Sequence, residues 1–339
     1  MKIFHDFDLS RVTTFHIPAT ARIYAEYESI GELYMLLNAP EYAGMPRLHI
    51  GGGSNLLFTG RFDGLVMHSA IKEITVIDDN GRQVYLKVSA GVNWDDFVRY
   101  CVDHELYGAE NLSYIPGEAG ASAVQNVGAY GVEAKDIIDS VHTVDSSTGE
   151  TRVFKAEECG YGYRNSIFKQ AGYAGRHIVT DVVYRLSREK HFTLDYGPLK
   201  ELADHSSNLT LKAVRDRVIE IRRNKLPKPD ELGSAGSFFK NPVVSTEKFE
   251  QLKADYPSIP SYPADGGIKI PAAWLIENTG MKGRSIGGAQ VYTKQCLVIV
   301  NTGNATAADV VSLYGEIKEK VAAKFGITLS PEVNIIGRL

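Results

Sequence analysis

The chain has 339 residues, of which 44% are hydrophobic and 23% are charged, as is ordinary for a globular protein of two or three domains. Its net charge of −4 gives no reason to expect a nucleic-acid partner, and its apolar runs are too short to span a membrane. Residues 1–8 lack the features of a signal peptide. Three widely spaced cysteines argue against disulfides and a thiolate metal site, so we expect a cytoplasmic protein without a metal ion.

The first third of the chain predicts a strand, a helix and a second strand that ends in a glycine loop. Ser29 and Glu32 have the spacing of a capping box, which predicts a helix that runs to Leu37. The loop Gly51-Gly52-Gly53-Ser54-Asn55 follows the second strand. Alternating or apolar runs predict strands over 21–27, 47–50, 64–68, 73–78 and 82–90.

The middle of the chain predicts further strands around a second segment that is rich in small residues, 115–131. Asn93 is placed to cap a helix whose apolar residues from Trp94 to Val102 recur at helical spacing, which assigns Cys101 to the core. Strands are predicted over 140–145, 151–155 and 176–186, with a turn at 146–149 and a turn-rich insertion at 194–199.

The last third begins at a predicted domain junction, 224–230, because Pro227 and Pro229 would end the preceding helix over 210–223. The segment 233–242 then combines glycines, a serine, two phenylalanines and a lysine. Helices are predicted over 246–254, through 274–275 up to Gly280, and from Thr306 to a C-cap at Gly326, and strands over 297–301 and 331–336.

The two glycine-rich loops, 51–55 and 115–131, must either bind a ligand or form tight turns. Neither has the spacing of the dinucleotide fingerprint or of a P-loop. Both offer clustered backbone N–H groups, which suit a pyrophosphate, so one dinucleotide held from two sides and a pair of tight turns are equal alternatives. Glu118 would repel a pyrophosphate, and we expect it to point to solvent or to pair with a cation.

Five segments of the chain carry a resemblance to a known family: 50–56, 115–131, 163–166, 236–242 and 331–333. In this order they resemble those of the UDP-N-acetylenolpyruvoylglucosamine reductase family, over nearly the whole chain. The resemblance implies an NADPH-dependent FAD oxidoreductase that forms UDP-N-acetylmuramate for peptidoglycan synthesis. The implied FAD is non-covalently bound, and NADPH is the co-substrate.

The resemblance implies an α+β fold, with an FAD-binding domain of the vanillyl-alcohol-oxidase (PCMH) type in two α+β subdomains and a C-terminal α+β substrate-binding domain. The surroundings of Tyr196, with Tyr262 and Lys269 further on, resemble the form of the family that closes a tyrosine-bearing loop over its substrate. We assign 1–70 to the first subdomain with 331–339 returning to it, 71–223 to the second, with a PCMH-type region over 15–188, and 224–330 to the substrate domain.

The resemblance also implies roles for individual residues. Ser237 would be the proton donor, and Arg164 and Glu332 would stabilise the enol(ate) intermediate. His16 stands where many relatives have a small residue, and we interpret it as structural because the family's flavin is not covalently attached. The residues implied to bind the UDP-sugar are Tyr163, Tyr196, Lys225, Asn241, Tyr262 and Lys269. The residues implied to bind FAD are Gly51, Gly52, Gly53, Ser54, Asn55, Leu56, Ile115, Pro116, Gly117, Gly120, Ala121, Ser122, Gln125, Asn126, Gly128, Ala129, Tyr130 and Val179.

The implied chemistry suits these residue types. Hydride addition to the enolpyruvyl double bond leaves negative charge beside the carboxylate, and Arg164 can fork onto that group, with a structural ion pair as the alternative. The Ser237 hydroxyl can protonate a strongly basic carbanion in a dry site. No G-x-S-x-G elbow surrounds it, which argues against covalent catalysis, and a turn or cap residue is the plain alternative. Glu332 would be a general acid or would orient the intermediate, and a solvated carboxylate is its alternative.

Two other functions remain open on the sequence. One is a flavin oxidase of the same FAD fold, which would pass electrons to oxygen, and the other is a non-catalytic carrier of a nucleotide sugar or flavin. The combination of Ser237, Arg164 and Glu332 argues against both, since a carrier has no need of a proton donor. We expect a monomer with a UDP-sugar substrate and no nucleic-acid or membrane partner.

Overall fold

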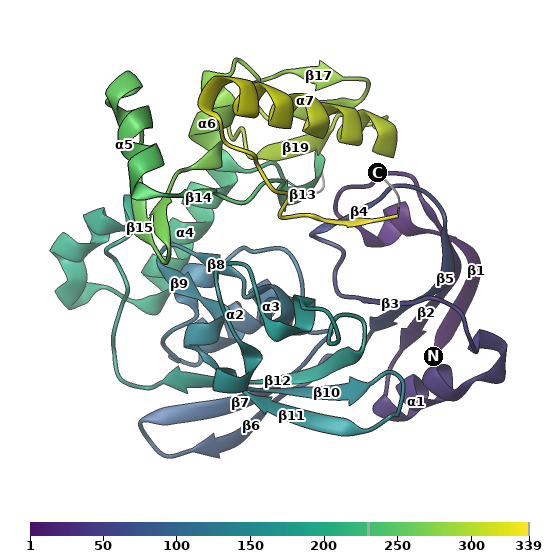
Figure 1. The fold of residues 1–339 in the computed structure, drawn as a ribbon. Coiled ribbons are helices and arrows are strands. Elements are labelled where there is room, and N and C mark those ends of the chain that lie inside the picture. The colour runs from purple at the N-terminus through teal and green to yellow at the C-terminus, as the bar shows by residue number, and fades with distance from the viewer. Residues whose placement is uncertain (229–230, 338–339) are drawn as a thin grey trace. The chain divides into compact units, whose positions relative to one another are not determined.

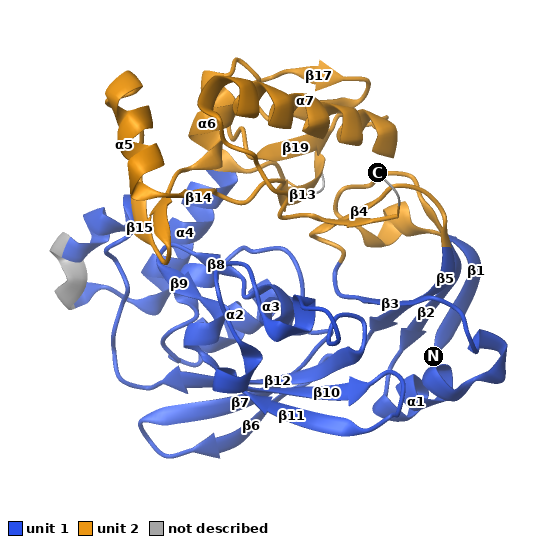
Figure 2. Ribbon diagram, in the orientation of Figure 1, with its two compact units in different colours: residues 1–7, 21–52, 63–224 blue, residues 8–20, 53–62, 225–339 orange. Residues whose placement is uncertain are grey.

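The described residues form two compact units, each built from several chain segments (Figure 2). The computed structural model describes residues 1–228 and 231–337, with the backbone alone at 204–207. Pro229 and Asp230 of the predicted junction, and the last two residues of the predicted returning segment, lie outside the described residues. The three-part domain division stays a prediction. Unit 1 contains residues 1–7, 21–52 and 63–224, and unit 2 contains residues 8–20, 53–62 and the chain from 225 onward.

Unit 1 contains two larger β-sheets, a two-stranded one and four helices (Figure 1). One sheet has the order β1-β2-β5-β3, with β3 parallel to β5, and the other is antiparallel with the order β11-β10-β12-β7-β6. The strands are β1 (Lys2–Asp8), β2 (Thr20–Tyr27), β3 (Arg47–Ile50), β5 (Phe62–Ser69), β6 (Ile74–Asp79), β7 (Gln83–Ser89), β8 (Gly128–Ala129), β9 (Val132–Glu133), β10 (Ile138–Asp145), β11 (Thr151–Lys155) and β12 (His177–Ser187). The helices are α1 (Ile30–Asn38), α2 (Trp94–Asp103), α3 (Ala119–Gln125) and α4 (Leu211–Lys225).

Capping and apolar periodicity explain helices α1 and α2. Ser29 Oγ accepts from the Glu32 amide at 3.2 Å, as the capping box predicts, and Asn93 Oδ1 accepts from two amides at the start of α2. The predicted apolar stripe of α2 is buried, including Cys101 at 0% exposure, which confirms its place in the core.

Two elements of unit 1 have no signal in the sequence. The side chains of β1 are nearly all exposed, so the strand shows no apolar alternation. Helix α3 consists mainly of alanine, glycine and serine, and no apolar stripe predicts it. Gly120 lets α3 lie against the residue after β7, because a Cβ there would be 2.6 Å from Ala90 Cβ. The Gly120 amide also donates to the Ala90 carbonyl at 3.0 Å.

A buried ion pair links the first turn of α2 to α4. Both guanidinium nitrogens of Arg215 donate to Asp95, at 2.7 and 2.8 Å, and the Tyr114 amide donates to the same carboxylate. Burial raises the pKa of Asp95, but these hydrogen bonds outweigh it and hold the pKa below its usual value. The pair therefore stabilises the fold above the ordinary carboxyl pKa, and its contribution is lost as pH falls through the lowered pKa.

Asp95→Asn should lower the free energy of unfolding by about 2–3 kcal/mol at neutral pH, less than for a fully buried pair since Asp95 is partly exposed. Urea unfolding measures this difference, which should shrink as the solution becomes more acidic than an unperturbed aspartate pKa. Asp96→Asn is the matched control, because Asp96 pairs with Arg99 at the surface and should cost almost nothing. Equal losses in both variants would contradict the role of the Arg215 pair.

The described residues of unit 2 form three small sheets, of orders β13-β19-β18-β17, β14-β16-β15 and β20-β4, and three α-helices (Figure 1). The strands are β4 (Leu56–Phe58), β13 (Gly233–Ser237), β14 (Val243–Val244), β15 (Tyr262–Ala264), β16 (Gly267–Lys269), β17 (Ser285–Ile286), β18 (Ala289–Val291), β19 (Val298–Asn301) and β20 (Asn334–Ile336). The helices are α5 (Thr246–Asp255), α6 (Ala272–Asn278) and α7 (Ala307–Phe325).

Helix α7 confirms its sequence signals, whereas the final strand is shorter than predicted. Thr306 and Asp309 form the expected capping box, and Gly326 ends the helix with φ 64°. The strand predicted over 331–336 is regular only as β20, because its parallel pairing with β4 begins at Asn334. Among the described residues, no helix has the length and apolar character needed to cross a bilayer.

Candidate functional site

In unit 1 two residues of the first glycine loop, Gly51 and Gly52, lie against the second loop. A Cβ added to Gly51 would meet Ala121 and Glu118 at 3.3 Å, and one added to Gly52 would lie 3.5 Å from the Gly117 backbone. The absence of side chains allows this close approach. The two segments that the sequence predicts for one dinucleotide are therefore neighbours at these positions.

Glu118 pairs with a cation, which is one of the two outcomes expected from the sequence. Its Oε1 lies 2.9 Å from Nε2 of His68, on strand β5. The carboxylate makes no capping hydrogen bond to α3, although Glu118 is the residue before that helix. The sequence gives no sign of this partner, because strand β5 and the second loop are 50 residues apart.

Arg164 forms hydrogen bonds to backbone carbonyls near the end of the second loop. Its guanidinium donates to the carbonyl oxygens of Gly128 at 2.6 Å and of Asn126 at 3.3 Å. Arg164 has φ 53°, in the left-handed region, and its guanidinium lies 5.6 Å from the Tyr163 ring. Lys169 donates to Gln125 and to the Arg164 carbonyl, so the loop and the predicted catalytic arginine form one hydrogen-bonded group.

The insertion with Tyr196 packs beside the last residues of the same loop. A Cβ on Gly131 would lie 3.3 Å from Cβ of Tyr196, so only glycine allows this approach. Asn111 donates to the carbonyl oxygens of Tyr130 and Thr193, at 2.9 and 2.7 Å, and thereby ties the insertion to the loop. The Tyr196 side chain is 45% exposed. The insertion is thus anchored at its base while its tyrosine faces solvent.

In unit 2 a β-bulge presents Ser237. Strand β13 pairs with β19 at Ser234 opposite Val300 and at Ser237 opposite Val298. Between these two pairs β13 advances by three residues and β19 by two, so β13 has one extra residue there. Gly236 takes φ 71°, which the bulge requires and which a side chain would strain. Ser237 is half-buried at the end of the strand. The following Phe238 and Phe239 are 1% exposed and pack against Tyr314.

Glu332 lies beside this bulge. Its amide donates to the carbonyl of Phe238 at 2.8 Å, and the neighbouring Pro331 bridges to Phe239. Asn55 of the first glycine loop donates through Nδ2 to the Glu332 carbonyl at 3.3 Å. The structure therefore brings together Ser237, Glu332 and Asn55, whose positions in the chain differ by up to 277 residues.

Three residues predicted to bind the UDP-sugar meet at a hairpin of unit 2. Tyr262 and Lys269 are direct cross-strand partners on β15 and β16, so their side chains lie on one face. Asn241 accepts from the Ala272 amide at 2.9 Å, just beyond that hairpin. A ring, an ammonium group and an amide on neighbouring backbone are suited to a nucleotide diphosphate.

Other predicted residues are placed less directly. Lys225 is exposed at the end of α4. Val179 is 4% exposed within β12, and Ser122 is 1% exposed with its hydroxyl at 2.8 Å from Tyr184. Both side chains face the core, so contact with a ligand would involve their backbone. His16 is exposed, takes φ 53° and bonds to the Ser10 carbonyl, in keeping with a turn residue.

Arg222 is a functional candidate that the sequence did not single out. It interacts with the Tyr130 hydroxyl and donates to the Tyr114 carbonyl at 2.9 Å. Burial lowers its pKa and raises that of Tyr130, so a half-buried cation lies beside the second loop. The signal available in the sequence was weak, since Arg222 is one of several charged residues on α4.

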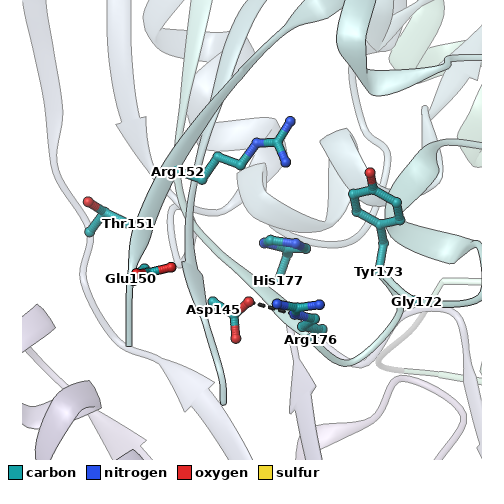
Figure 3. Close-up of a pocket in the computed structure, with 8 residues that line it drawn as sticks. All are labelled: Asp145, Glu150, Thr151, Arg152, Gly172, Tyr173, Arg176 and His177. Atoms are coloured by element: carbon teal, nitrogen blue, oxygen red, sulfur yellow. Dashed lines mark hydrogen bonds and ion pairs between the residues drawn. The ribbon is translucent and has the colours of Figure 1, made fainter. Parts of the chain in front are cut away.

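A polar hollow of about 390 Å³ lies elsewhere in unit 1, near the ends of β10 and β12 (Figure 3). Asp145, which lines it, accepts from Arg176 Nε at 2.6 Å and from the Ser147 hydroxyl and the Thr148 amide. These bonds confirm the turn predicted at 146–149. The hollow contains none of the predicted site residues, and Asp145, which Arg176 contacts, holds this turn.

Comparison with known proteins identifies the family. Residues 228–336 match the model of the C-terminal domain of UDP-N-acetylenolpyruvoylglucosamine reductase, and residues 21–155 match an FAD binding domain. A protein of that reductase name from Bacteroides fragilis is 48% identical over 324 residues, which cover 95% of this chain and 97% of the relative. One from Porphyromonas gingivalis is 48% identical over 338 residues, 99% of this chain and 100% of the relative. The chain belongs to the UDP-N-acetylenolpyruvoylglucosamine reductase family.

The fold agrees with this assignment. The reductase structure from Thermus caldophilus has a TM-score of 0.68 at 23% identity and covers 99% of this chain and 98% of its own. The predicted α+β fold, with an FAD-binding domain followed by a C-terminal domain, is confirmed. Gly51 and Gly52 approach residues 117–121 closely, so the two glycine-rich segments implied to bind FAD lie side by side there.

Proposed function

We propose that Ser237 protonates the substrate carbon during reduction of the enolpyruvyl group of UDP-N-acetylenolpyruvoylglucosamine, while Arg164 and Glu332 stabilise the charge that develops. As a member of this reductase family, the chain is an FAD-dependent oxidoreductase (UDP-N-acetylmuramate dehydrogenase) of peptidoglycan precursor synthesis. FAD, when bound, supplies hydride transfer from NADPH to the substrate. The tasks left to the protein are binding, orientation and delivery of a proton.

The bulge at Ser237 is the observation that carries this proposal. The bulge places a half-buried serine directly before two core phenylalanines, and the Glu332 amide bonds to the carbonyl of the first of them, Phe238. A hydroxyl is a weak acid, so its position matters more than its pKa when it protonates a carbanion. Strand bulges are a recurrent means of directing a side chain at an active site.

Arg164 would act on the substrate carboxylate. Its guanidinium is held by two backbone carbonyls, which orients the cation without neutralising it. A preoriented cation is most effective where negative charge increases in the transition state. Tyr163, Lys225, Asn241, Tyr262 and Lys269 would hold the UDP-sugar, and Tyr196 would cover it and exclude water.

The proposed function is tested by identifying the product of the reaction. Purified protein should be yellow with bound FAD and, with NADPH and the enolpyruvyl sugar, should form a UDP-sugar two hydrogen masses heavier. An oxidase would consume oxygen instead, and a carrier would return the sugar unchanged. Either outcome in place of the heavier product would overturn the proposed function.

We also propose a monomeric enzyme that acts in the cytoplasm, without nucleic-acid or membrane partners. All three cysteines are free and buried, which suits a reducing compartment. A molar mass by light scattering that differs from the 37.3 kDa of one chain would contradict the monomer.

A further inference from the structure

Glu118 is an unexpected residue in a loop that is proposed to hold the FAD diphosphate. Its carboxylate packs against the first glycine loop, with Oε2 3.3 Å from the position of a Cβ on Gly51 and Cγ 3.6 Å from that on Gly52. A negative charge at this place opposes a bound anion unless something compensates for it. Gly51, Gly52 and Glu118 all belong to unit 1, and so does the group that pairs with Glu118.

A chain of alternating charges leads from this carboxylate to the protein surface. His68 Nε2 lies 2.9 Å from Glu118, and His68 Nδ1 lies 3.6 Å from Glu26 Oε2. Lys2 on β1 donates to the other oxygen of Glu26 at 2.8 Å. The His68 and Glu118 side chains are only 15% and 11% exposed, so little solvent screens them.

His68 is the member of this chain whose charge changes near neutral pH. Burial lowers its pKa, but the hydrogen bond and charge of Glu118, together with the charge of Glu26, outweigh burial and raise the pKa above its usual value. Glu26 remains ionised, because its bond to Lys2 lowers its pKa. Lys2 remains a cation, because the same bond raises its own pKa.

The tyrosines and the histidine on the neighbouring strands do not change charge near neutral pH. On β2, burial raises the pKa values of Tyr24 and Tyr27. On β3, burial lowers the pKa of His49 to about 3, so it stays neutral beside Tyr27. On β12, Asp181 is an acidic neighbour of the same cluster, 3.6 Å from Lys87 of β7.

We propose that His68 is the built-in counter-cation of Glu118, and that the pair couples FAD affinity to pH. The proposal rests on the proposed function, in which the two glycine loops hold the FAD diphosphate. With His68 protonated, its positive charge cancels that of Glu118 next to the loops. Loss of the proton leaves an uncompensated negative charge there, so affinity falls as pH rises, and FAD binding takes up a proton near the His68 pKa.

The direct experiment is a titration of apoprotein with FAD, followed by quenching of flavin fluorescence, at intervals from pH 6 to 9. The dissociation constant should rise about fivefold to tenfold across this range. Calorimetry in buffers of different ionisation enthalpy should detect the proton uptake independently. Neither measurement depends on catalytic activity, and the wild-type series requires no variant to fold.

Variants separate this pair from other titrating groups. Glu118→Gln should remove the pH dependence and bind FAD at pH 9 about as tightly as the wild type does at pH 6. His68→Gln should bind weakly at every pH, and His68→Gln with Glu118→Gln should restore affinity. Glu28→Gln is the matched control, since Glu28 is an exposed acid of the same surface, 3.9 Å from Lys2, and should keep the wild-type profile.

The possible outcomes separate the role of His68 from the assignment of the glycine loops to FAD. FAD binding with a flat pH profile, or a profile that survives Glu118→Gln, would overturn the role of His68 and leave the proposed function intact. Absence of FAD binding at every pH would overturn the assignment of the loops to FAD and, with it, the inference.

Discussion

Ser237→Ala should leave reduction of the flavin by NADPH unchanged and should slow the reaction of the reduced enzyme with substrate by ~10²-fold or more. The alanine keeps the bulge, because Gly236 and the strand pairing supply its geometry. Only the proton donor is lost. Hydride transfer to the substrate would then leave negative charge on the neighbouring carbon atom, which Ser237 could no longer protonate. Stopped-flow absorbance of the flavin separates the two half-reactions.

Ser234→Ala is the matched control for this variant. Ser234 lies on the same strand and is also half-buried, but its backbone, through its bond from Thr14, fulfils its structural role. Both half-reactions should therefore stay close to wild type. Normal turnover in Ser237→Ala would remove Ser237 from the mechanism and leave it as a bulge residue.

Arg164→Gln should slow the same substrate half-reaction by ~10²–10³-fold, because a preoriented charge opposite developing negative charge is lost. Arg164→Lys should recover only part of the rate, since an ammonium group keeps the charge but lacks the planar fork. The rate of flavin reduction by NADPH should change little. Single-turnover measurements at saturating substrate give these rates.

The structure offers a control for a purely structural role of Arg164. Its bonds to Gly128 and Asn126 hold the second loop, so Arg164→Gln will also loosen that loop. Lys169→Met removes the neighbouring support to Gln125 and to the Arg164 carbonyl without removing the guanidinium. Equal losses of rate in the two variants would contradict a charge-stabilising role and assign Arg164 to loop structure.

Local signals predicted most regular elements of this fold. The caps at Ser29, Asn93 and Thr306 specify helix starts with side-chain atoms that lie within three residues of their partners. Helix α3 was not predicted from the sequence. Its small residues pack against neighbouring elements through close backbone approach, so no apolar residues recur at helical spacing. Strand β1 was not predicted either. It is stabilised by pairing with β2, and its side chains are nearly all exposed, so they show no alternation of apolar and polar residues.

The sequence predicted which segments contribute residues to the candidate site, but it did not predict which of these residues lie close together. Recognition of the family motifs named Ser237, Glu332 and Asn55, but their proximity depends on the pairing of β20 with β4, which no local pattern encodes. The bulge at Gly236 likewise depends on the register with β19. Physical reasoning about Glu118 left exposure to solvent and pairing with a cation open, and only the structure identifies His68 as its partner.

An anaerobic two-step titration tests the central claim most directly. NADPH added without oxygen should bleach the flavin absorbance, and stoichiometric UDP-N-acetylenolpyruvoylglucosamine should then restore it. Restoration by the enolpyruvyl sugar, with oxygen much slower, is the result that we predict. Flavin that stays bleached with the sugar and recovers only with oxygen would contradict the account.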